Sequence, residues 1–255
     1  HQYDGKLPDV SAGGLAARVA WLEGELRAFE AIPAGELAGE AAIERDVILS
    51  VIRGDLFDLK VARWPMVNPM SYIDRLALID YISRDYAPLA DRARGVVGIC
   101  VGAKAYLEAA QANLPEAIPR TWIDTALLQI SGMIDFAYKD VVEALASLED
   151  KELSAKVGES LLAYAAALTA YRDFLTARLP KATDDFALGA DRFLAMLSAK
   201  EGVVFDLARL EQIGKADLER NLAAIGEAAR QIDAARPVAQ VVLEVKQDKP
   251  AAAKV

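Results

Sequence analysis

The sequence predicts an all-α protein, an irregular bundle of long antiparallel helices. Apolar residues recur three or four positions apart along most of the chain, a spacing that stacks them on one face of a helix. No segment alternates apolar and polar residues between turn signals, as a half-buried strand does. Hydrophobic residues make up 54% and charged residues 26% of the 255 residues. This balance is typical of a chain that folds around a core and not of a disordered one.

The first part of the chain reads as two helices followed by a loop. Ser11 suits the N-cap of the first helix, and the second runs from about Glu36 to Ala62. Pro65 and Pro69 then disfavour helix at the residues before them, which predicts a loop.

A long helix is expected to begin near Pro88 and to run past three glycines spaced one turn apart. These are Gly95, Gly98 and Gly102. Small residues at that spacing allow close approach, so we expect another helix to pack tightly there.

The helices that begin near Thr121 and Lys151 carry matched apolar stripes across a short turn, so they should pack as an antiparallel hairpin. Further along, Asp184 or Asp185 could cap the next helix and Asp206 the one after it. We expect residues 1–235 to form one helical domain. Residues 236–255 read as a linker or the start of a helix.

The net charge of -9 argues against nucleic acid as a partner, because an acidic surface repels phosphates. No apolar run is long enough to span a membrane. The chain begins at His1, which fits either a removed signal peptide or a remnant of expression.

The chain carries no recognisable catalytic motif. Its only histidine is His1, which excludes an H-E-x-x-H zinc helix and Ser-His-Asp or Cys-His catalysis within these residues. Cys100 lies in an apolar run and reads as a buried hydrophobe. The neighbouring Asp184 and Asp185 could be a metal or acid/base pair, as could Glu40 with Glu44; capping and a solvated face are the simpler interpretations.

Several stretches, in this order, resemble a known family. They are "LPDVSAGGLAARVAWLEGELRAF", "RDVILSVIRGDLFDL", "NPMSYIDRLALIDYISRDYAPLADRARGV", "LEAAQANLPEAIPRTWIDTALLQISGMIDF" and "FALGADRFLAMLSAKEG". Together they resemble the amino-terminal half of the bacterial family catalogued as domain of unknown function 885, whose members look like gluzincin-type zinc metallopeptidases, many of them exported.

The resemblance implies that the chain shapes a substrate cleft for peptide hydrolysis carried out by a carboxy-terminal half outside it. That half would follow residues 236–255, hold the zinc and be the chain's partner, and a peptide would be the substrate. We expect no cofactor, zinc ligand or catalytic residue in the present chain, and a periplasmic or otherwise exported location rather than a cytoplasmic one.

The cleft residues that we expect combine aromatic and polar groups around the Pro-bounded loop, where ligand contacts concentrate. They are Trp64, Asn68, Tyr72, Arg84 and Tyr86. The simpler interpretation is an ordinary loop anchored by core aromatic residues.

Two other functions stay open. The first is a non-enzymatic helical scaffold or interaction protein, and the second is a bundle that binds a small molecule near Trp64 and Trp122. An H-E-x-x-H motif encoded downstream of Val255 would favour the peptidase hypothesis, and a stop codon would favour the scaffold. The apolar spacing of Val238, Val241, Val242 and Val245 predicts that the segment after Arg236 associates with a second polypeptide or with another copy.

Overall fold

The structure, a computed structural model, describes residues 2–249, except for the side chain of Ala34. Within these residues it is helical and contains no strand, only an isolated parallel bridge between Pro119 and Thr183. The predicted all-α fold is therefore confirmed. The chain divides into two compact units, His1–Gly202 and Val203–Val255, which are described in turn.

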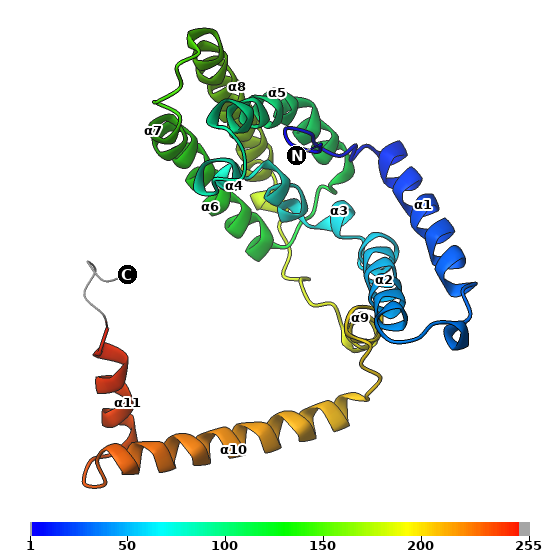
Figure 1. The fold of residues 1–255 in the computed structure, drawn as a ribbon, viewed down its shortest axis with the longest axis vertical. Helices are drawn as coiled ribbons and strands as arrows, with labels where there is room; N and C mark the ends of the chain where they lie inside the picture. The colour runs from blue at the N-terminus through cyan, green and yellow to red at the C-terminus, as the bar shows by residue number, and fades with distance from the viewer. Residues whose placement is uncertain (1, 250–255) are drawn as a thin grey trace. The chain divides into compact units, whose positions relative to one another are not determined.

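The first unit consists of helices joined by short irregular segments (Figure 1). The α-helices are α1 (Ala12–Glu30), α2 (Glu40–Leu56), α3 (Trp64–Val67), α4 (Ile79–Ser83), α5 (Leu89–Asn113), α6 (Arg120–Phe136), α7 (Val142–Ala144), α8 (Lys151–Thr176) and α9 (Ala190–Glu201). The described residues of this unit also form the 3-10 turns η1 (Ala34–Glu36), η3 (Pro69–Tyr72), η4 (Asp74–Leu76) and η6 (Leu179–Lys181). The π-helical turn η2 (Phe57–Val61) extends α2, and η5 (Ala137–Val141) joins α6 to α7.

The core forms where α8 packs against α5 and α6. The predicted pairing of α6 with α8 is present, but α5 is the more extensive partner of α8. Fully buried alanines on α5, among them Ala93, Ala103 and Ala110, allow the two helices to approach closely. At the start of α8 the Asp150 carboxylate accepts a hydrogen bond from the Leu153 N–H at 3.0 Å, which satisfies one free amide of the first turn.

Among the three glycines of α5, Gly95 packs against another helix as expected, the short helix α4 that carries Tyr81. Instead of another helix, the N-terminal segment crosses Gly98, and a Cβ built there would lie 2.5 Å from the Gly5 carbonyl oxygen. Gly95 makes room for the Tyr81 ring, whose hydroxyl accepts the Gly5 N–H at 3.0 Å. Gly5 itself has a φ of +69°, a conformation that glycine adopts without strain.

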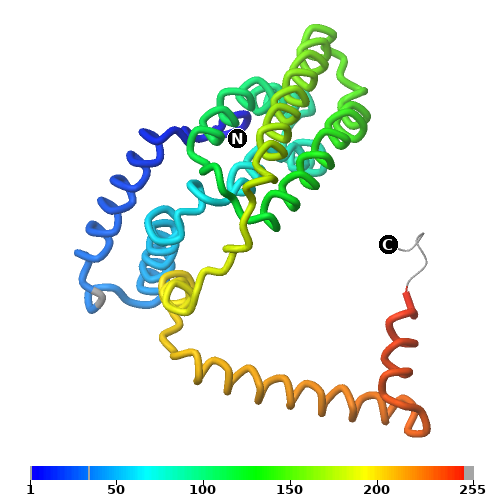
Figure 2. Tube along the Cα trace, turned by 180° about the vertical axis from the view of Figure 1, so that it is seen from behind, coloured from blue at the N-terminus to red at the C-terminus, as the bar shows by residue number. Residues whose placement is uncertain are grey.

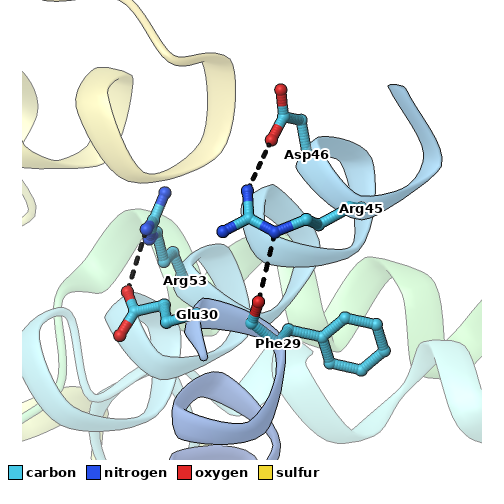
Figure 3. Close-up of polar contacts among 5 residues, drawn as sticks. All are labelled: Phe29, Glu30, Arg45, Asp46 and Arg53. Carbon is cyan, nitrogen blue, oxygen red and sulfur yellow. Dashed lines mark hydrogen bonds and ion pairs between the residues drawn. The ribbon is translucent and has the colours of Figure 1, made fainter. Parts of the chain in front are cut away.

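Helices α1 and α2 pack together and are bridged by polar contacts, one exposed and one half-buried (Figure 3). Arg53 pairs with Glu30 at 2.9 Å, and the Arg45 Nε donates to the Phe29 carbonyl at 3.2 Å. Exposed ion pairs of this kind contribute only ~0–1 kcal/mol each, so apolar packing around Leu22, Leu49 and Ile52 is the larger stabilising contribution.

Helix α9 is fastened to α2 and η2 through Lys200. Its ammonium group pairs with Asp58 at 2.7 Å, and its carbonyl accepts from the Ser50 hydroxyl at 3.0 Å. The expectation that Asp184 or Asp185 caps this helix is wrong. Gly189, with a φ of +82°, occupies the N-cap position, and both aspartates lie in the irregular segment before it.

The second unit contains α10 (Leu207–Ile232) and α11 (Val238–Gln247) (Figure 2). Asp206 caps α10 as expected, accepting from the Arg209 N–H at 2.7 Å. The apolar face expected after Arg236 is partly covered within the unit, because Val241 of α11 is buried, as is Ala229 of α10. Val238 and Val245 are exposed, and residues 250–255 lie outside the described part of the chain.

We predict that Gly98→Ala destabilises the protein by ~1–3 kcal/mol, because the new methyl group would collide with the backbone of Gly5. The matched control is Gly158→Ala in α8, where nothing lies within 4 Å of the added Cβ. That control should be neutral or stabilising by up to ~1 kcal/mol, since alanine favours helix. Urea denaturation measures both, and equal stabilities for the two variants would contradict the contact.

Candidate functional site

Residues 65–76 were predicted as a loop, but they form short helical turns: most of α3, followed by η3 and η4. Buried tyrosines hold this segment against the core. The Tyr171 hydroxyl donates to the Pro69 carbonyl at 3.0 Å, and the Tyr164 hydroxyl donates to the Leu76 carbonyl at 2.8 Å. Burial raises the pKa of both phenols far above the ordinary value, so they remain protonated donors. Each bond gives a hydrogen-bond partner to a carbonyl of the short helical turns, one at the start of η3 and one at the end of η4.

The chain turns sharply just before this segment, at Arg63. Arg63 has a φ of 55° and a ψ of 39°, and it is the only non-glycine residue in the described part of the chain with positive φ. Left-handed backbone is uncommon for a residue with a Cβ and costs roughly 1–2 kcal/mol. The turn starts α3 at Trp64, whose ring meets Trp122 of α6 edge to face, with centroids 5.8 Å apart.

The two tryptophans line a pocket of about 380 Å³ in the first unit. Its wall is mainly apolar and comes from α3, the α5–α6 connection, the start of α6 and the segment that leads into α9. Besides Trp64 and Trp122, it includes Ala62, Val67, Pro115, Ala117, Pro119, Phe186, Ala187 and Leu188. The small-molecule hypothesis expected a pocket near Trp64 and Trp122, and a pocket is present there.

Polar groups on the pocket lining come chiefly from the segment before α9 and from the first turn of that helix. Thr183 is held by the bridge to residues 118–120, with its N–H donating to the Ile118 carbonyl at 3.1 Å. Asp185 and Arg192 are exposed, and within the described residues neither side chain forms a hydrogen bond or ion pair. The pocket thus combines an aromatic wall with one free acid and one free base.

Among the five cleft residues that the sequence predicted, only Trp64 lines this pocket. Asn68 caps η3, its side chain accepting from the Met70 N–H at 2.9 Å. Tyr72 is buried, donates to the Pro65 carbonyl and accepts from Asn113 at 3.0 Å. The contacts of Asn68 and Tyr72 are those of residues that support the loop from inside.

Arg84 and Tyr86 lie on the connection between α4 and α5. Arg84 is exposed and pairs with Asp80 at 3.2 Å, whereas the Tyr86 hydroxyl donates to Asp4 at 3.1 Å. Burial, and to a lesser extent this contact with Asp4, raises the pKa of Tyr86 to about 12. Arg92 fixes the connection through its buried guanidinium, which donates to the Ala87 carbonyl at 2.9 Å and to Asp85 at 2.7 Å.

Sequence reasoning missed the pocket residues contributed by the segment before α9, above all Phe186 and Arg192. The sequence signal that could have found them is Phe186, a lone aromatic residue in the polar connection between two helices. In the structure this side chain is 53% exposed. Neither pair of carboxylates belongs to a larger cluster of metal-ligating side chains within the described residues. Glu40 and Glu44 are exposed on α2, and residues 2–249 contain no group of three or more His, Cys, Asp or Glu that could hold a metal ion.

The left-handed turn gives a direct test of how Trp64 is placed. Arg63→Gly should be neutral or stabilise the fold by up to ~1 kcal/mol, because glycine adopts this conformation without steric cost. Arg63→Val should destabilise it by at least ~1 kcal/mol, since a β-branched residue resists positive φ. Thermal and urea unfolding measure the difference, and a valine variant as stable as the glycine variant would contradict the turn.

Comparisons with known proteins agree with this fold. A solved structure of a candidate lipoprotein of unknown function from Shewanella oneidensis superposes with a TM-score of 0.75 at 18% identity. The match covers 91% of the present chain but 43% of that one, so the chain spans less than half of its neighbour's length. No curated protein matches the sequence.

No described helix combines the length and apolarity that crossing a membrane requires. A family profile described as "Bacterial protein of unknown function (DUF885)" matches residues 1–254, nearly the whole sequence. The chain therefore belongs to the DUF885 family of bacterial proteins.

Proposed function

We propose that this chain is the helical part of a zinc-metallopeptidase-like protein and that it shapes the groove for a peptide hydrolysed by residues outside the chain. The observation that carries the proposal is the Trp64–Trp122 pocket, an aromatic hollow at the Pro-bounded loop where substrate contacts were expected. Membership of the family supports it, as does the longer chain of the structural neighbour. Export is part of the same proposal, in keeping with the neighbour's description as a candidate lipoprotein.

The residues of this chain do not fit a zinc ion. His1 is the only histidine, and burial raises the pKa of the Cys100 thiol to about 12, although a contact with Ser160 opposes the shift. A thiol with so high a pKa stays protonated at neutral pH and is a poor metal ligand. The proposal therefore assigns the zinc to residues outside this chain and assigns to this chain the binding and orientation of the peptide.

An interaction protein without enzymatic activity is the second candidate. Helix α10 favours it, because it carries large aliphatic residues that are exposed in the structure. These are Leu207, Ile213, Leu218, Leu222, Ile225 and Ile232. An apolar surface of this kind usually marks a contact. Reading the gene downstream of Val255 separates the two candidates. A zinc motif there would favour the peptidase, and a stop codon would favour the interaction protein.

The proposed function predicts peptide cleavage by a gene product that extends beyond Val255. Such a product should cleave internally quenched peptides and lose this activity in a chelator. Trp64→Ala should raise KM on the order of tenfold with little change in kcat, because the pocket contributes binding and not chemistry. The matched control is Trp21→Ala on α1, a tryptophan that is 53% exposed and stacks only with Arg18 in the described structure.

Two results would count against the proposal. One is an extended product that cleaves no peptide at any zinc concentration. The other is a Trp64→Ala variant that is kinetically the same as Trp21→Ala.

A further inference from the structure

The shape of the Trp64–Trp122 pocket suits a bulky apolar or aromatic group. Its volume of about 380 Å³ lies near the lower end of the ~300–1,000 Å³ typical of ligand pockets. Both indoles are half-buried and cross at 73°, and Phe186 is exposed at the same pocket. Aromatic pairs favour edge-to-face and offset contacts, so an entering ring or branched side chain can pack against these three.

The backbone beside the pocket is free to form hydrogen bonds. The segment 184–189 is neither helix nor strand, and its one internal bond runs from the Phe186 N–H to the Asp184 carbonyl at 2.9 Å. The N–H groups of Asp185, Ala187 and Leu188 have no protein partner within the described residues. Proteins that bind extended peptides combine main-chain hydrogen bonds with pockets for side chains, and this part of the molecule offers free main-chain N–H groups beside a pocket.

The charges at the pocket favour a neutral main chain over a strongly charged ligand. Its lining contains one acid, Asp185, and one base, Arg192, so the two charges cancel. A phosphate-bearing ligand would need a cluster of cations, which the lining lacks. A peptide backbone offers donors and acceptors together and no net charge.

We propose that this pocket binds an extended peptide. One bulky apolar or aromatic side chain enters between Trp64 and Trp122, and the peptide main chain pairs with residues 185–188. The inference rests on the proposed function and names the side-chain class that the groove selects. The chain alone binds such a peptide without cleaving it.

Tryptophan fluorescence of the Trp21→Phe chain tests this, because its signal comes from Trp64 and Trp122 alone. The probes are acetyl-Ala-Ala-Phe-Ala-Ala-amide, its all-alanine analogue, and the phenylalanine peptide with N-methylated backbone amides. We expect saturable binding of the first probe, on the order of tenfold tighter than either analogue, because each analogue lacks one of the two contacts.

A pair of proline variants tests the main-chain contact from the protein side. Ala187→Pro removes a free N–H, whereas Ala190→Pro falls at the first position of α9, which tolerates proline. Ala187→Pro should weaken binding several-fold and Ala190→Pro should not, with circular dichroism confirming that both fold. The N-methylated probe answers the same question on the unaltered backbone if a variant fails to fold.

Three outcomes would overturn the inference: equal affinity for the phenylalanine and alanine peptides, no loss on N-methylation, or equally tight binding of acetyl-phenylalanine-amide alone. The last would mean that the pocket takes an isolated aromatic group. Peptide binding here with no cleavage by the extended gene product would contradict only the proposed function. Cleavage there with no binding here would contradict only this inference.

Discussion

The fold of the first unit depends on hydrogen bonds that join the long helix α8 to the short helical turns of residues 65–76. Residues 65–76 contain two prolines and cannot pair all their carbonyls in a helix. Tyr164 and Tyr171 reach these carbonyls from the core, and Tyr72 bonds to one from within the segment. A buried carbonyl without a partner costs roughly 1–3 kcal/mol. The three hydroxyls therefore stabilise the path of the chain through residues 65–76.

The same bonds place the pocket. The segment they hold begins one residue after Trp64, and on its other side Trp64 follows the left-handed turn at Arg63. The indole is thereby fixed from both directions while it faces Trp122, itself in the first turn of α6. A preformed aromatic wall beside a segment with free backbone groups, 184–189, would let the proposed peptide bind with little rearrangement of the protein.

The sequence predicted what depends on local chemistry. Apolar spacing located the long helices, and Ser11 and Asp206 cap helices as their side chains favour. What depends on distant partners could not be predicted. Nothing near Gly98 in the sequence indicates that Gly5 will cross it. The sequence also left open whether Tyr72 is a cleft or a core residue, and its contacts with Pro65 and Asn113 place it in the core. The pocket was only partly predicted for the same reason, because Phe186 and Arg192 lie far from Trp64 in the sequence.

The most direct test of the tyrosine anchor is hydrogen exchange, followed by mass spectrometry, of a Tyr164→Phe, Tyr171→Phe double variant. The matched control is Tyr138→Phe, which removes a hydroxyl from a ring that is 48% exposed. The anchor predicts faster exchange confined to residues 64–78 in the double variant, with α1 and α2 unchanged. Exchange in residues 64–78 as slow as in the control would show that the segment, and Trp64 with it, is held by something other than these hydroxyls.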